Sequence, residues 1–396
     1  MNSIYSDDVT LDTLRKELSE EQPKSPYLDF FLLSNPFPVA GQFSGICVNQ
    51  DDVKQEFART LREFYLDGQA RRMTIVGRTG AGKTNLLRFF EQRFREWREP
   101  LPGRPAITDL FTIFVREPQG GYFETHRQIV SQLGALFYTE FFEALHSGRI
   151  DLTTLPAELP GISPELVRIL GQIVRQLSFF GSSSQSIRVL DNWLQGVKLS
   201  TTEKRQLGGV TVDISKSSTV AIKFLGDLIR IFKHTQLFRG LVILFDEFEG
   251  ILSGLSPTNQ ARYAQDLRNL FDTLTEGVVF VIATAPISSN LAQVSPALSR
   301  RLSRGVDIEP VQDEESALEY ADAYIQLGRE LFQEQMQCEI TLPEDCYEED
   351  RPYYPLTHAT IIEVYEGLRE RQANVVPGDL LPELNLRLYR RVYEGS

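Results

Sequence analysis

The sequence predicts an α/β fold in which helices cover both faces of a parallel sheet. Three observations support this class. Short apolar runs of strand length recur along the chain, segments with apolar residues at helical spacing separate them, and a glycine-rich turn follows the first run. Strands that alternate with helices pair in parallel, because each helix returns the chain to the same end of the sheet.

Five strands are expected, and each is short and apolar enough to be buried on both faces. They are residues 73–76, 110–115, 241–245, 278–284 and 306–308. Residues 51–68, 84–97 and 124–145 carry apolar side chains at the three-to-four spacing of a helix. From about residue 151 to 240 strand signals are weak, apart from the run GVTVDI, so we expect a mostly helical insertion there.

The length of 396 residues allows two or three domains. We expect an N-terminal helix and linker at residues 1–34 and an α/β core at residues 35–310, which includes the insertion. Only helical patterns recur in residues 311–396, which predicts a small helical C-terminal lid.

The composition is that of a folded globular protein, with 42% hydrophobic and 24% charged residues. No apolar run approaches the roughly 18 residues of a membrane span, and the polar, acidic start of the chain is unlike a secretion signal. Three scattered cysteines fit a reducing compartment and give no disulfide or zinc pattern. We therefore expect a cytoplasmic protein that does not contact a membrane.

The net charge of -13 is unevenly distributed. Thirteen acidic residues and one basic residue, Arg329, lie between Asp313 and Asp350, so the rest of the chain is close to neutral. An acidic total argues against an overall basic surface for nucleic acid, but a nearly neutral core leaves room for a local one.

A P-loop follows the first expected strand and opens a helix, which is the context that this motif requires. Its glycines turn backbone N–H groups toward phosphates, Lys83 is expected to reach the β- and γ-phosphates of ATP, and the Thr84 hydroxyl is expected to bind Mg²⁺. The eight residues are Gly77, Arg78, Thr79, Gly80, Ala81, Gly82, Lys83 and Thr84.

The run LVILFDEFEG supplies two adjacent acids at the end of a buried strand. Asp246 is expected to join the Mg²⁺ shell, and Glu247 to orient and deprotonate the attacking water. Two carboxylates at a strand end are costly unless a cation lies beside them. Phe248 is expected to pack, and Glu249 to face solvent or a partner.

These motifs resemble the Walker A and Walker B motifs of P-loop ATPases of the AAA+ superfamily, which match GRTGAGKT and LVILFDE here. The resemblance covers about residues 35 to 385. It implies a three-layer core with a helical lid, ATP and Mg²⁺ as ligands, and nucleotide-dependent assembly with itself. It also implies that Thr284, at the end of the strand VVFVIAT, is the polar residue that helps to hold the attacking water.

The segment SPALSRRLSRGVDI resembles the AAA+ region in which an arginine acts on the nucleotide of a neighbouring subunit. Arg301 is our first choice, with Arg300 and Arg304 as alternatives. A cation at that position stabilises charge that develops on the phosphoryl group. The other interpretation is that these arginines pair with acids of their own subunit.

The C-terminal helices resemble the AAA+ lid but depart from it at one position. The family places an arginine after a proline there, whereas Pro377 is followed by Gly378 and Asp379. The residue by which the lid of the family contacts the γ-phosphate is therefore missing at this position. The arginines that could substitute are Arg371, Arg387 and Arg390.

A narrower resemblance, over residues 185–302, is to the ATP-binding proteins of BREX-type phage-exclusion systems, near the initiator ATPases. It rests on Trp193-Leu194-Gln195-Gly196 and on Leu207-Gly208-Gly209-Val210, the latter with one extra glycine. The alternative is that the segment is a spacer that packs on the core. Trp97 and Trp193 are expected to pack, and His126 to lie at the surface, although it follows the second strand and could approach the site.

Three functions remain open at this stage. The first is an ATPase that hydrolyses ATP to drive self-assembly or partner remodelling, with duplex DNA as a partner implied by resemblance. The second is a nucleotide-gated switch or scaffold whose acidic lid recruits an effector protein. The third is an ATPase that selects targets for transposition.

Overall fold

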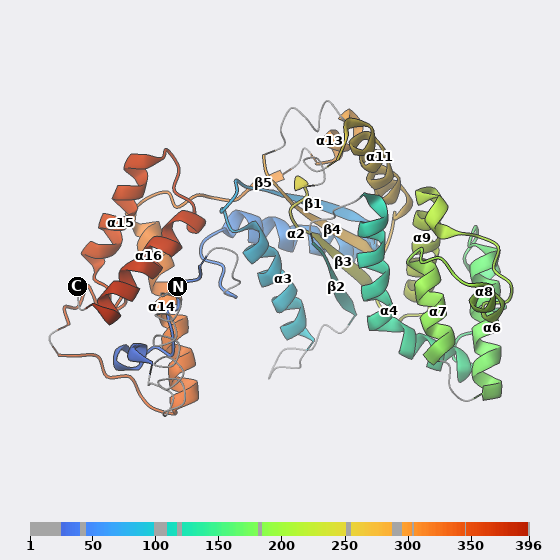
Figure 1. The fold of residues 1–396 in the computed structure, drawn as a ribbon, viewed down its shortest axis with the longest axis horizontal. Helices are drawn as coiled ribbons and strands as arrows, with labels where there is room; N and C mark the ends of the chain where they lie inside the picture. The colour runs from blue at the N-terminus through green and yellow to red at the C-terminus, as the bar shows by residue number, and fades with distance from the viewer. Residues whose placement is uncertain are drawn as a thin grey trace, which may run out of the picture. The chain divides into compact units, whose positions relative to one another are not determined.

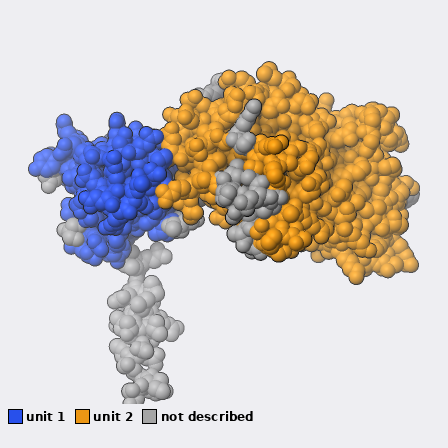
Figure 2. Space-filling model, turned by 90° about the horizontal axis from the view of Figure 1, so that it is seen from above, with its two compact units in different colours: residues 1–49, 310–396 blue, residues 50–309 orange. Residues whose placement is uncertain are grey.

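The structure, a computed structural model, describes residues 25–39, 45–98, 109–116, 121–180, 184–250, 255–286, 295–302, 305–344 and 346–394. It divides into two compact units, unit 1 with residues 1–49 and 310–396 and unit 2 with residues 50–309 (Figure 2). We expected the first boundary near residue 34. The residues just beyond it group with unit 1 because Phe37 is buried in its core, as are Tyr27 and Leu32 before the boundary. Residues 1–24 of the expected N-terminal helix lie outside the described residues.

Unit 2 contains a five-stranded parallel sheet with the strand order β2-β3-β4-β1-β5. Every residue of β3 and β4 is buried, as expected for central strands covered on both faces. Each strand begins within two residues of its expected position, so the predicted fold class is confirmed. The strands are β1 (Arg71–Val76), β2 (Leu110–Val115), β3 (Gly240–Phe245), β4 (Val278–Thr284) and β5 (Gly305–Asp307).

Helices cover both faces of this sheet (Figure 1). On one face α2 (Asp51–Asp67) and α3 (Lys83–Trp97) pack together, and the rings of Phe57 and Phe90 stack with centroids 3.9 Å apart. The other face carries α4 (Tyr122–His146), α9 (Ser218–His234) and α11 (Pro257–Thr273).

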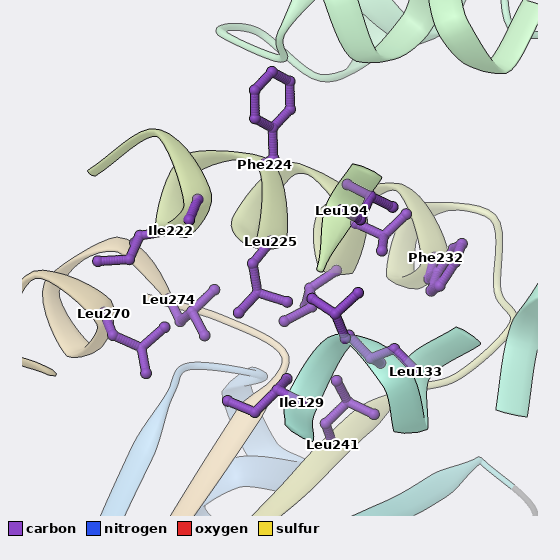
Figure 3. Close-up of a cluster of buried hydrophobic side chains, with 14 of the residues drawn as sticks. Ile129, Leu133, Leu194, Ile222, Phe224, Leu225, Phe232, Leu241, Leu270 and Leu274 are labelled. Atoms are coloured by element: carbon purple, nitrogen blue, oxygen red, sulfur yellow. The ribbon is translucent and has the colours of Figure 1, made fainter. Parts of the chain in front are cut away.

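The main core lies between the second group of helices and the sheet. In Figure 3, Leu225 of α9 points toward Ile129 and Leu133 of α4, and Leu241 of β3 lies below them. All four side chains are fully buried. Burying such side chains is the dominant favourable term in folding, so this cluster fixes α4 and α9 against the sheet.

The segment between α4 and α9 is helical in the described residues, and the run GVTVDI forms no strand there. The ring of Trp193 packs against Phe224 of α9, and its Nε1 donates a hydrogen bond to the Val212 carbonyl at 2.9 Å. Trp193 is therefore a packing residue. The elements of this segment are α5 (Leu155–Glu158), α6 (Pro164–Phe180), α7 (Ser184–Leu194), α8 (Thr201–Gln206) and the 3₁₀ helix η2 (Ile214–Lys216).

Unit 1 is helical, and its core is formed by helices from both ends of the described chain. Asn35 donates a hydrogen bond to the Asn385 carbonyl at 2.9 Å, and Asn385 donates one to the Phe37 carbonyl at 2.6 Å. These bonds hold the Asn35–Phe37 turn on the last helix. The elements are η1 (Pro26–Phe30), α14 (Glu314–Met336), α15 (His358–Arg371) and α16 (Pro377–Tyr393), while the short α13 (Pro296–Leu302) belongs to unit 2.

Every helix that the structure describes is too short or too polar to cross a membrane.

His126 is buried in α4, so the expectation of a surface histidine is wrong. Its Nε2 lies 2.7 Å from the Leu194 carbonyl, which can only accept, so Nε2 carries the proton. Nδ1 is buried without a hydrogen-bond partner among the described residues. Burial lowers the pKa of His126 to about 4, because the charged imidazolium would be desolvated.

This lowered pKa predicts a pH dependence of stability. As the pH falls below about 6.5, His126 takes up a proton in the unfolded chain but stays neutral in the folded protein. Stability is therefore fully present above that pH and is lost as the pH falls toward 4, by about 2 kcal/mol between pH 7 and 5. Urea unfolding at the two pH values should show a smaller loss in His126→Gln than in the wild type.

The matched control is His146→Gln, because His146 is exposed at the end of the same helix. The control should keep the wild-type pH dependence. Equal losses in the wild type and in His126→Gln would exclude a neutral, buried His126 as the cause.

Candidate functional site

The P-loop connects the carboxyl end of β1 to the start of α3. Gly80 and Gly82 have φ angles of +81° and +94°, a region that side chains rarely adopt. A Cβ atom at Gly77 would lie 3.1 Å from the Ala81 Cβ and 3.3 Å from the Ile308 Cβ, so the close approach there also requires glycine. The glycines of the motif thus allow the loop to curl around the amino end of α3, where phosphate groups bind.

Lys83 is buried at the first position of α3. Its Nζ donates hydrogen bonds to the carbonyls of Gly77 at 2.8 Å and Arg78 at 3.3 Å, so the lysine folds back over its own loop. Nζ also forms an ion pair with Glu249 Oε1 at 3.2 Å. The ammonium therefore lies inside the P-loop, where it can meet a phosphate.

Thr84 and Asp246 meet between the two motifs. The Thr84 hydroxyl donates a hydrogen bond to Asp246 Oδ1 at 3.1 Å, and Asp246 follows directly after β3. Burial raises the pKa of Asp246, while the hydrogen bond from Thr84, that from the Glu247 N–H and the charge of Lys83 act in the opposite direction. A bound cation at this carboxylate would remove much of the cost of its burial.

Glu247 is exposed and has a left-handed backbone, with φ +49°. Its N–H donates to Asp246 Oδ1 at 3.0 Å, so the backbone of Glu247 holds the Asp246 carboxylate. A left-handed conformation costs a non-glycine residue about 1 kcal/mol. Such strain is typical of functional sites, where the surrounding structure holds a residue in an unfavourable conformation.

Thr284 lies beside the start of the P-loop. It ends β4, pairs in register with Val76 of β1, and its carbonyl accepts a hydrogen bond from the Gly77 N–H at 3.0 Å. The residue is 4% exposed. Since β4 lies between β1 and β3 in the sheet, Thr284 is placed between the P-loop and the Asp246-Glu247 pair.

Glu249 was expected to face solvent or a partner, and it instead pairs with Lys83. The only feature of the sequence that points to this contact is the spacing between Glu249 and the strand end. Glu249 follows Asp246 by three residues, and a tight turn after a strand can bring such a residue back toward the strand end.

Arg301 lies at the far end of the sheet from the P-loop. Its Nη2 donates hydrogen bonds to both carboxylate oxygens of Asp272 on α11, at 2.9 and 3.0 Å. Arg72, the second residue of β1, donates a hydrogen bond to the carbonyl of Phe271, which precedes Asp272, so Arg301 lies near the amino end of β1. Arg72 and Gly77 are separated by about 16 Å of extended strand. Arg300 lies on the same short helix, and Arg304 lies outside the described residues.

The site has the oxygen donors that Mg²⁺ prefers, in the Thr84 hydroxyl and the Asp246 carboxylate. The described residues contain no group of three or more His, Cys, Asp and Glu side chains that could hold a metal on their own. A magnesium ion bound through one or two protein oxygens and the phosphates of a nucleotide fits this arrangement, because Mg²⁺ usually keeps several non-protein ligands.

The expected arginine of the lid is absent in the structure as it is in the sequence. Pro377 begins α16, and Asp379 accepts a hydrogen bond from the Gln372 side chain at 2.8 Å. Of the possible substitutes, Arg387 pairs with Glu363 of α15 at 2.8 Å. The contacts described within unit 1 therefore do not identify which of the three arginines takes the role of the missing lid arginine.

The Trp193–Gly196 element closes α7 and ties it to two other segments. His126 of α4 donates to the Leu194 carbonyl, Trp193 reaches the Val212 carbonyl, and Gly196 has φ +74°. Both the tryptophan and the leucine are buried. The element therefore serves the packing of the helical segment on α4 and α9.

Comparison with known proteins agrees with these features. Residues 163–314 match the family model described as "BREX system ATP-binding protein BrxC/D", which confirms the narrower resemblance predicted from the sequence. A solved structure of the Aeropyrum pernix ORC2 protein, in ADPNP-ADP complexes, has 13% sequence identity and a TM-score of 0.41, and the alignment covers 89% of this chain and 71% of that chain. A search of curated proteins gives no match. The P-loop follows β1 of a parallel sheet and opens α3, so the predicted α/β fold with a P-loop between strand and helix is confirmed.

Proposed function

We propose that this protein is an AAA+ ATPase that hydrolyses ATP to ADP and phosphate. The observation that carries the proposal is the hydrogen bond of 3.1 Å between Thr84 and Asp246, which brings the P-loop together with the acids that follow β3. This arrangement provides phosphate binding, oxygen donors for Mg²⁺ and a carboxylate for a general base within one site.

Each residue has one role in the proposal. The P-loop backbone and Lys83 bind the phosphates, and Thr84 with Asp246 holds Mg²⁺, which neutralises phosphate charge. Glu247 accepts a proton from water while the water oxygen bonds to the γ-phosphorus and the bond to the β,γ-bridging oxygen breaks. Thr284 helps to position that water, in agreement with its place between the two motifs.

Glu247→Gln tests the role of the base. The amide keeps the size and hydrogen-bonding capacity of the side chain but cannot accept the proton at neutral pH. We expect ATP binding close to that of the wild type and a fall in steady-state hydrolysis of at least about 100-fold. Titration with a fluorescent ATP analogue and a phosphate-release assay measure the two quantities. Near-normal hydrolysis would remove Glu247 from this role.

We also propose that the protein assembles with itself in the presence of ATP, and that Arg301 acts on the nucleotide of a neighbouring subunit. In its own subunit Arg301 pairs with Asp272, beside the Phe271 carbonyl that Arg72 contacts at the amino end of β1, whereas the P-loop follows the carboxyl end. It is therefore too distant to serve its own nucleotide. An arginine in this position contributes to hydrolysis only when two subunits meet.

Mixed assemblies test the proposed role of Arg301. Subunits with Arg301→Ala keep Glu247, and subunits with Glu247→Gln keep Arg301, so an interface between them contains one complete site. Each variant alone should be almost inactive, and their mixture should recover a measurable fraction of wild-type hydrolysis. Sedimentation must show that both variants assemble. Absence of recovery from intact mixed assemblies would contradict a role in trans.

Duplex DNA is the partner that we propose for the assembly, and phage defence is the proposed setting. The match to a BREX ATP-binding family supports the setting. The local charge is compatible with DNA, because Lys198, Lys204 and Arg205 are exposed around α8 in the insertion. Contacts from such residues to phosphates release counterions, and they weaken as the salt concentration rises.

The DNA proposal predicts salt-dependent binding that depends on the insertion. The affinity for a labelled duplex should fall steeply between 50 and 200 mM salt, and Lys204→Ala with Arg205→Ala should lower both the affinity and the salt slope, the slope by about 2. The matched control removes Arg390 and Arg391, an exposed basic pair on α16. An equal loss in both double variants would show that only net charge matters.

A second function, a nucleotide-gated scaffold that recruits an effector protein, is favoured by one observation. Arg329, the only basic residue between residues 313 and 350, is buried and donates hydrogen bonds to the carbonyls of Arg351 and Tyr354. Its guanidinium therefore bonds to carbonyls and forms no ion pair with an acid among the described residues. Absence of salt-dependent DNA binding, together with slow hydrolysis by a monomer, would favour this scaffold and a basic protein as its partner.

A further inference from the structure

Glu249 places a carboxylate against the P-loop lysine. Its Oε1 lies 3.2 Å from Lys83 Nζ, and the other two contacts of Nζ are the carbonyls of Gly77 and Arg78. An ammonium group has three protons, so these three contacts use all of its donors. Of the three acceptors only Glu249 is charged. It therefore takes the place on Lys83 that an anionic ligand would take.

The fold holds Glu249 in this position through its neighbours. The Phe248 N–H donates a hydrogen bond to the Ala283 carbonyl of β4 at 3.1 Å, and the Phe248 ring is buried against Phe245. The Gly250 N–H donates to the Glu247 carbonyl at 2.9 Å, which closes the turn. Glu249 thus projects from a turn that is fixed on both sides, and its approach to Lys83 follows from the backbone.

Lys83 is the group that stabilises Glu249 there. The second carboxylate oxygen, Oε2, is buried and has no hydrogen-bond partner among the described residues. The charge of Glu249 also acts on Asp246, whose pKa it raises, so the two carboxylates repel each other. Without the ammonium, Glu249 would be a partly buried anion next to another anion, which is a costly arrangement.

We propose that Glu249 competes with nucleotide phosphates for Lys83 and so sets the affinity of the P-loop for nucleotide. Phosphate and carboxylate are both anionic acceptors, and both form charge-assisted hydrogen bonds with an ammonium. A nucleotide that binds through Lys83 must therefore break the Lys83–Glu249 ion pair. This inference rests on the proposed function and adds a regulatory residue to its site.

The test measures binding of ADP rather than hydrolysis. ADP in the presence of EDTA still needs Lys83 for its β-phosphate but involves no Mg²⁺ and no turnover. We expect Glu249→Gln and Glu249→Ala to lower the Kd for ADP by about fivefold or more, because the charged competitor is gone. The matched control is Glu276→Gln, which removes the carboxylate of another Lys–Glu pair of unit 2, that with Lys233. It should leave the Kd unchanged.

Three outcomes would overturn the inference. Equal affinities in the wild type and both Glu249 variants would exclude competition, and the proposed ATPase activity could still stand. Weaker binding of the variants with Mg²⁺ but unchanged binding in EDTA would assign Glu249 to the magnesium site instead. Absence of ADP binding in all proteins, with folding confirmed by thermal unfolding, would overturn both this inference and the proposed function.

Discussion

The hydrogen bond from Thr84 to Asp246 is the contact on which the candidate site depends, because it joins residues that are 162 positions apart in the chain. Thr84 lies in α3, after the P-loop that follows β1, and Asp246 follows β3, and these two strands are not neighbours, since β4 lies between them. The two motifs can therefore meet only through side chains that reach across the end of β4. This constraint explains why Thr284, the last residue of β4, lies between them.

The sheet makes this meeting point possible because its central strands β3 and β4 carry no charged side chain. All residues of β3 and β4 are buried, and helices pack on both faces. Charged groups can therefore appear only where the strands end and the chain turns. Parallel strands place all of their carboxyl ends at one edge, and the P-loop, Asp246 and Thr284 accordingly gather there. The apolar core and the polar site are two consequences of one topology.

Much of the fold could be predicted because its signals are local. The apolar strands, the P-loop glycines and the two acids of LVILFDE are recognised from short stretches of sequence, and the parallel order of the sheet follows from their alternation with helices. The burial of His126 was also accessible in principle. It lies three residues before Ile129 and four before Val130, so helical spacing places it on the apolar face of α4, although histidine as a residue type is only intermediate in burial.

The ion pairs could not be predicted, because they depend on distances between segments that the sequence does not relate. Asp272 lies 29 residues before Arg301, and no periodicity connects them. The composition of unit 1 from both ends of the chain could not be predicted either. Its contact between Asn35 and Asn385 joins residues that are 350 positions apart. Such contacts follow from tertiary packing, and a single sequence contains no pattern that selects one acid among many.

The Arg301–Asp272 and Lys83–Glu249 ion pairs differ in how easily they can be exchanged, and the difference matters for function. The Arg301–Asp272 pair is partly exposed on both sides, with side-chain exposures of 27% and 42%, so it contributes about 1 kcal/mol or less. The phosphates of a nucleotide bound to a neighbouring subunit carry a larger charge than Asp272. They can therefore displace this carboxylate from Arg301 at a small cost in free energy. The self-paired arginine is therefore compatible with a role in trans, and the two interpretations of the sequence do not exclude each other.

The Lys83–Glu249 pair is different, because the Lys83 side chain is only 8% exposed and water is a poorer replacement for its partner. Breaking this pair leaves a partly buried carboxylate beside Asp246 unless that carboxylate moves or another cation arrives. Nucleotide binding through Lys83 should therefore move the Glu249 side chain, while the hydrogen bonds of Phe248 and Gly250 hold the backbone of its turn. The exchange of one anionic partner of Lys83 for another then needs no motion of the sheet or of the turn that also carries Glu247.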